Sequence, residues 1–164
     1  MIIRPVREDD VEAVAALWRE LVDFHQALDN RLPTPAEDGE YRYMQRIRYS
    51  MDDSYVQTYI AEDDGDIIGY VLGTIIDLLP EMFEAEKAGM VADIYVQHSH
   101  RSQGVGRALM KQMRAWFKLR GVSHYEWYVA ATNSAGIRFW QETIGGESVM
   151  IRMRAPVDDD SSTS

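Results

Sequence analysis

One stretch of the sequence carries most of the information about the fold: residues 93–109, which read DIYVQHSHRSQGVGRAL. It begins as a strand, turns through a polar loop, and continues from Gly104 with apolar residues at helical spacing. Glycine lets a backbone approach a ligand closely, and the first N–H groups of a helix have no partner within the helix. The helix dipole, Arg101 and Arg107 add positive charge there, so the stretch predicts a phosphate-binding site.

Two familiar phosphate-binding motifs do not fit this stretch. A Rossmann dinucleotide site needs a third glycine, where this chain has Leu109, and it follows the first strand of a domain rather than a later one. A P-loop needs Gly-Lys followed by Ser or Thr, which residues 104–107 do not supply. Taken alone, the two glycines are also consistent with a tight turn that binds nothing.

Periodicity on both sides of this stretch predicts a mixed domain. Alternating or short apolar runs indicate strands at residues 2–6, 54–62, 67–79, 91–96, 124–130 and 148–153. Three- and four-residue spacing indicates helices at residues 11–29, 40–51, 104–121 and 133–144. The order β-α-α-β-β-β-α-β-α-β predicts an α/β (α+β) fold in which a mixed central sheet has helices on both faces.

Length and composition predict one globular domain. The chain has 164 residues, of which 46% are hydrophobic and 27% charged. We expect a single domain over residues 1–155, followed by an acidic, disordered tail over residues 156–164. The sequence has no cysteine, which excludes disulfides, a thiol nucleophile and cysteine-based metal sites, and fits a cytoplasmic protein.

Charge and hydropathy indicate which classes of binding partner to expect. The formal net charge is −10, from 27 acidic and 17 basic residues, and no basic stripe predicts nucleic-acid binding. The acidic balance serves solubility and mildly favours cationic partners such as amines. We expect no membrane segment, because the longest apolar stretch, near residues 67–79, is interrupted by glycine, threonine and aspartate. His98 and His100 have no third ligand in the sequence that would indicate a metal site.

Two motifs resemble those of the GNAT superfamily of N-acetyltransferases. Residues 101–106, RSQGVG, match its acetyl-CoA signature [Q/R]-x-x-G-x-[G/A], and residues 133–140, NSAGIRFW, are similar to its second motif, N-x-x-A-x-x-[LF]-Y. The predicted element order is also that of the superfamily, to about residue 155. The resemblance implies acetyl-CoA as cosubstrate and direct transfer of the acetyl group to a primary amine of a small molecule or protein. Homodimers are common in the superfamily, but no residues here identify an interface.

The resemblance also implies which residues bind acetyl-CoA. Backbone N–H groups of residues 103–107 would cradle the pyrophosphate, and Ile94 and Val96 would pair with the pantetheine arm between two diverging strands. An N–H near Ile94 would stabilise the thioester oxyanion. Asn133 would reach the pantetheine or cap its helix. The expected coenzyme-binding residues are Ile94, Val96, Arg101, Ser102, Gln103, Gly104, Val105, Gly106, Arg107, Asn133 and Trp140.

The catalytic residues are harder to assign. Free alkyl amines have a pKa of about 10.4, so direct transfer needs a proton acceptor. Asp93 is the candidate base, because it resembles an acidic position in the polyamine acetyltransferases of the superfamily; the alternative is a strand carboxylate paired to a neighbour. Alternation places Asp93 and Tyr95 on one sheet face and residues 94 and 96 on the other.

The second motif usually ends in a tyrosine that protonates the sulfur of coenzyme A, but this chain has Trp140, whose indole is not a usable acid. Tyr128, Tyr95 or water would take that role, or the thiolate would leave unassisted; Tyr128 is our candidate. Because of Trp140, the alternative function is a regulatory or sensor protein that binds acyl-CoA with little turnover. His25 is interpreted as a core histidine on an apolar helix face, with the acceptor pocket as the alternative.

Overall fold

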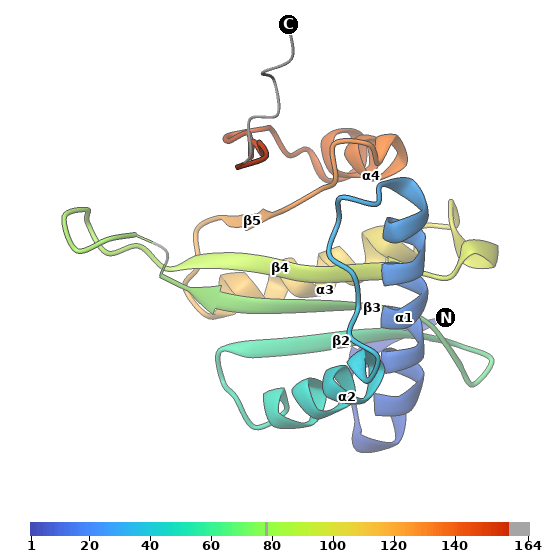
Figure 1. The fold of residues 1–164 in the computed structure, drawn as a ribbon. Coiled ribbons are helices and arrows are strands. Elements are labelled where there is room, and N and C mark those ends of the chain that lie inside the picture. Colours follow the sequence, from blue (N-terminus) through green and yellow to red (C-terminus); the bar gives the residue numbers. More distant parts are fainter. Residues whose placement is uncertain (78, 158–164) are drawn as a thin grey trace, which may run out of the picture.

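The computed structural model describes residues 1–77 and 79–157, which form a five-stranded sheet with helices on both faces (Figure 1). The strands are β1 (Ile2–Pro5), β2 (Val56–Asp63), β3 (Asp66–Ile76), β4 (Ala88–Val96) and β5 (Tyr125–Trp127). The helices are α1 (Val11–Leu28), α2 (Gly39–Ser50), α3 (Val105–Leu119) and α4 (Ser134–Arg138), and α4 continues as a π-helical turn over Phe139–Ile144. The strands lie in sequence order, and all neighbours are antiparallel except β4 and β5, which are parallel.

Two hydrophobic clusters hold the helices to the sheet. The cluster beneath α1 and α2 includes Val11, Val14, Ile47, Ile60 and Tyr70. The cluster beneath α3 includes Val71, Leu109, Met113, Phe117 and Trp140. Successive strand residues such as Tyr70 and Val71 enter opposite clusters because side chains alternate across a strand.

A β-bulge in β4 decides which side chains face which helices. Leu72 pairs with Asp93 and Gly73 pairs with Val91, so Ala92 is an extra residue in the ladder. In a regular strand, in which Ala92 also had a partner, Val91 and Asp93 would share a face. The bulge instead leaves Val91 in the cluster beneath α3 and turns Asp93 toward α2.

β4 and β5 pair over three residues only. Their last pair is Val91 with Trp127, although β4 continues to Val96. Beyond that pair the chain after β5 turns away from β4 toward α4 (Figure 1). The edge of β4 over residues 92–96 therefore has no strand partner on this side among the described residues.

The predicted fold class is confirmed, but the predicted last strand is wrong. Residues 148–153 form no strand, although their sequence alternates. A strand needs an edge to pair with, and these residues pair with none of the described strands. Just after them, Arg154 donates a hydrogen bond to the carbonyl of Arg31, in the loop after α1, at 2.9 Å. Four of its apolar side chains are at least 80% exposed: Val149, Met150, Ile151 and Met153.

The predicted range 124–130 shrinks to the three residues of β5, because only these have a partner on β4. The boundary at residue 155 stays a prediction. Residues 158–164 of the predicted tail lie outside the described residues.

Candidate active site

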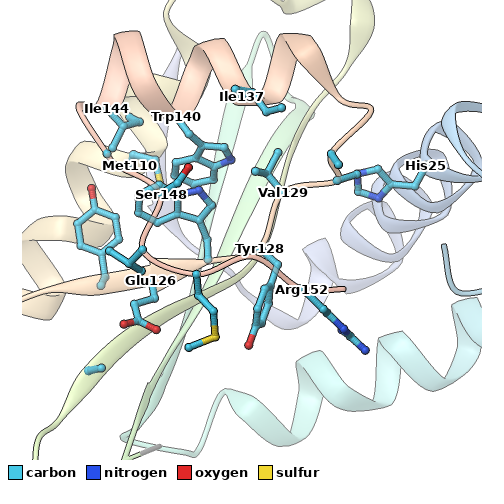
Figure 2. Close-up of a pocket in the computed structure, with 18 of the residues that line it drawn as sticks. His25, Met110, Glu126, Tyr128, Val129, Ile137, Trp140, Ile144, Ser148 and Arg152 are labelled. Carbon is cyan, nitrogen blue, oxygen red and sulfur yellow. The ribbon is translucent and has the colours of Figure 1, made fainter. Parts of the chain in front are cut away.

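The diverging ends of β4 and β5 border a cavity of about 660 Å³, here called the β4–β5 cavity. A wider open cleft adjoins it, here called the wide cleft, with α2 and the loop before it on one wall and β5 and the C-terminal segment on the other (Figure 2). Residues that line both include His25, Trp127, Tyr128, Val129 and Trp140. The two spaces therefore adjoin along these shared residues.

The start of α3 presents backbone donors to the β4–β5 cavity. The chain enters this helix through two residues with left-handed backbone, Ser102 at φ +61° and Gly104 at φ +83°. The N–H of Ala108 donates to the carbonyl of Gly104 at 3.0 Å, so the N–H groups of residues 105–107 have no partner within the helix. A Cβ on Gly106 would lie 3.1 Å from the Phe139 ring. These donors and the helix dipole make the site suited to an anion.

Arg101 is held inside the loop. Its Nε donates to the carbonyl of Val96 at 3.0 Å, and its guanidinium carbon lies 5.1 Å from the ring centroid of Phe24 and 5.3 Å from that of Tyr95. These contacts join the end of β4 to α1. Arg101 thus holds the loop after β4 in place and also lines the cavity, and its direct contact with phosphate stays a prediction.

Two other polar residues of the loop differ in position. Arg107 is exposed in the first turn of α3 and lines both spaces, so its charge is available to a ligand. The side chain of Gln103 donates to the carbonyl of Ser99 at 3.0 Å, and Gln103 does not line the β4–β5 cavity. Any contact of Gln103 with coenzyme therefore falls to its backbone.

Asp93 meets α2 at the place where β4 leaves β5. The hydroxyl of Tyr43 donates to Asp93 Oδ2 at 2.9 Å and lies 3.4 Å from the hydroxyl of Tyr70. Burial raises the pKa of Asp93 above its usual value, opposed by the Tyr43 hydrogen bond and by the positive charge of Arg46. Burial also raises the pKa of both tyrosines well above the usual value, so both hydroxyls keep their protons. A carboxylate with a raised pKa is a better proton acceptor near neutral pH.

His25 lines the site instead of the core. It is half-buried near the end of α1 and lines both spaces. The interpretation as a core histidine is therefore wrong, because the periodicity of α1 continues beyond the part of the helix that the sheet covers. Burial lowers the pKa of His25, against the opposing charge of Asp93. Nearby, Trp18 stacks on Tyr43 with 4.9 Å between the ring centroids, and both residues line the wide cleft.

The opposite wall comes from β5 and α4. Asn133 accepts a hydrogen bond from the Gly136 N–H at 2.9 Å, which confirms its predicted capping role, and it also lines the β4–β5 cavity. Trp140 is 6% exposed and stacks on Trp127 with 4.3 Å between the ring centroids. Tyr128 is 78% exposed and lines both spaces, so its hydroxyl is open to solvent and ligand.

Every predicted site residue except Gln103 lines the β4–β5 cavity. The sequence analysis did not assign Tyr43 to the site. On α2, Tyr43 and Ile47 are buried, whereas Tyr41 and Met51 are exposed. The four-residue spacing of Tyr43 and Ile47 was the available signal, but it does not point to Asp93, fifty residues away.

Within residues 1–77 and 79–157, no three side chains of His, Cys, Asp or Glu gather as they would around a metal ion. In the same part of the chain, no helix combines the length and apolar character needed to cross a membrane.

The sequence pattern of the acetyltransferase (GNAT) family matches residues 16–145. No curated protein matches the chain significantly.

Solved structures resemble the whole described fold. A mutant of the BH1408 protein from Bacillus halodurans has a TM-score of 0.85 at 20% identity, over 96% of this chain and 99% of that one. The aminoglycoside 6'-N-acetyltransferase AAC(6')-IG from Acinetobacter haemolyticus has a TM-score of 0.72 at 19% identity, over 98% and 100%. Aminoglycoside N-acetyltransferase AAC(6')-Iy in complex with CoA has a TM-score of 0.72 at 16% identity, over 96% and 95%. At these identities the likeness shows the fold alone.

Proposed function

This chain belongs to the acetyltransferase (GNAT) family, and from that premise we propose that it transfers an acetyl group from acetyl-CoA directly to a primary amine. The observation that carries the proposal is that a backbone anion site and a carboxylate of raised pKa line one cavity. The first suits the coenzyme and the second suits the amine.

The cavity has the features that acetyl-CoA requires. The unpartnered N–H groups of residues 105–107 would bind the pyrophosphate, with Arg107 adding charge. The unpaired edge of β4 would bind the pantetheine arm as an added strand through Ile94 and Val96. An N–H group near Ile94 would then donate to the thioester carbonyl oxygen, where negative charge develops. The structural relative AAC(6')-Iy was solved with CoA, which supports an acyl-CoA ligand for this fold.

Asp93 would accept the proton of the attacking amine. It lines the β4–β5 cavity and accepts a hydrogen bond from Tyr43, which lines the wide cleft, so an amine would reach this carboxylate where the two spaces adjoin. Tyr128 would supply a proton to the departing sulfur, because it lines both spaces and its hydroxyl is exposed. Trp140, packed on Trp127, would cover the pantetheine arm and exclude water. We propose that the reaction takes place in the cytoplasm, which the absence of cysteine supports.

The alternative is an acyl-CoA-binding regulatory protein with little turnover. It is favoured by Trp140, since indole cannot replace the usual acid. A thiol-release assay with acetyl-CoA and a panel of primary amines separates the two. We expect amine-dependent release of CoA together with acetylated amine detected by mass spectrometry. Tight binding of acetyl-CoA without release by any amine would favour the regulatory protein.

A further inference from the structure

The wide cleft is basic although the chain as a whole is acidic. Nine of the 17 Lys and Arg residues line it, but only four of the 27 Asp and Glu residues do. Among those four acids, Asp29 forms an ion pair with Arg31 at 2.7 Å. The carboxylates of Glu86 and Glu126 lie 3.4 and 3.8 Å from the ring nitrogens of His124. The cleft therefore has an excess of positive charge, which repels an acceptor that carries several positive charges.

One arginine of α2 that lines the wide cleft forms no ion pair with an acidic residue of the described ranges. Of the three arginines of α2, Arg42 pairs with Asp38 at 2.8 Å and Arg48 pairs with Glu8 at 2.6 Å. Arg46 forms no ion pair with any residue in the described ranges, 1–77 and 79–157. A guanidinium left free in a cleft can bind a carboxylate through two parallel hydrogen bonds.

Arg46 is placed where an acceptor would contact it. It follows Tyr43 by three residues, so the two lie on neighbouring positions of one helix face, and both line the wide cleft. Its positive charge lowers the pKa of Asp93 and of Tyr70. Arg152 lines the same cleft from the C-terminal segment (Figure 2).

We infer that the acceptor is a small amine that also carries a carboxylate, of the amino-acid class, and that Arg46 binds this carboxylate while the amine lies at Asp93. The inference rests on the proposed acetyl transfer and adds the acceptor class to it. The stacked rings of Trp18 and Tyr43 line the same wall and favour an apolar or aromatic side chain on the acceptor. A positive charge near the amine also favours its neutral, reactive form.

The test uses probes that differ only at the carboxylate: L-phenylalanine, L-phenylalaninamide and phenethylamine, with cadaverine as a diamine. We would measure kcat/KM for each probe with the full-length protein and with R46Q. The matched control is R114Q, which removes the same charge from an exposed α3 residue of the same cleft. Comparing variants within each probe cancels the differences in amine pKa. Binding of each probe to protein saturated with CoA is measured by calorimetry, so that one reading does not depend on turnover.

We expect R46Q to lower both kcat/KM and affinity for L-phenylalanine at least tenfold, and to change these two quantities less than threefold for the other probes. We expect R114Q to change neither quantity by more than threefold for any probe. Equal losses for all probes, no loss in R46Q, or a preference for cadaverine would overturn the inference while leaving acetyl transfer intact. If no probe is acetylated, the proposed function fails for these amines, and the binding measurement still tests whether Arg46 binds the carboxylate. A carboxylate preference that R46Q removes would support the site, and failure of L-phenylalanine to bind would overturn the inference.

Discussion

The two halves of the site are built in different ways. The coenzyme half consists mainly of backbone: the end of β4, the loop after it and the start of α3 are contiguous in sequence over residues 93–107. The acceptor half consists of side chains from three separate segments, since Trp18 lies on α1, Tyr43 on α2 and Asp93 on β4. A backbone site can therefore be recognised from a local sequence pattern, whereas a site made of side chains from separate segments forms only when the chain has folded.

The largest effect is expected on the coenzyme half, from Gly104→Glu. The substitution places a negative charge beside the proposed pyrophosphate site and a side chain at a backbone φ of +83°, so acetyl-CoA binding should be lost. Calorimetry measures the affinity. Gly121→Glu is the control, because Gly121 has φ +76° and is also exposed, but it lies outside both spaces. If Gly104→Glu bound acetyl-CoA as the parent chain does, the coenzyme half would be misassigned.

Trp140→Ala should affect stability and coenzyme binding together. Removing a buried Trp typically costs about 3–5 kcal/mol of folding free energy, and here it also opens the wall beside Trp127. Trp116→Ala is the matched control, since Trp116 is equally buried but lines neither space. Denaturant unfolding and calorimetry on both variants should show a shared loss of stability and a loss of acetyl-CoA affinity in Trp140→Ala alone. Equal affinities would remove Trp140 from the coenzyme site.

Trp140→Tyr tests whether the usual acid is missing. We expect turnover to stay the same or to fall a few-fold. Tyrosine is smaller than tryptophan and leaves a void against Trp127, and the exposed hydroxyl of Tyr128 is already present beside the site. Tyr128→Phe should then lower kcat. Steady-state kinetics of both variants checks this, and a several-fold gain in Trp140→Tyr would contradict it in favour of a protein that has drifted from catalysis.

The smallest effect concerns the acceptor half. The Tyr43 hydroxyl donates to ionised Asp93 and so holds its pKa down; removing the donor raises that pKa further. Tyr43→Phe should therefore move the acid limb of the kcat/KM profile to higher pH, by about one unit or less. Tyr41→Phe, on the exposed side of α2, should leave the limb in place. A Tyr43→Phe limb that stays, or moves to lower pH, would remove Asp93 as the titrating base.

The sequence predicted the mixed sheet and the helix order, and nearly all residues proposed for the coenzyme half line the β4–β5 cavity. Strand alternation, helix spacing and the glycines at 104 and 106 act locally, so they can be recognised in the sequence. It did not predict that residues 148–153 would lack a strand, since pairing depends on a neighbouring edge and not on alternation. It could not place Asp93 toward α2, because that orientation depends on the bulge at Ala92. The partnership of Asp93 with Tyr43 depends on how α2 packs on the sheet.

Asp93→Asn tests whether the two halves of the proposed site meet at Asp93. We expect the acetylation rate at neutral pH to fall by about 10²–10⁴-fold, with acetyl-CoA affinity unchanged. Because the folded-state pKa of Asp93 is raised, its ionisation opposes folding above the unfolded-state pKa, so Asp93→Asn should keep or raise the melting temperature at neutral pH. All three quantities should be measured on one preparation. A lowered melting temperature with full turnover per folded molecule would show that Asp93 is structural and would contradict the account.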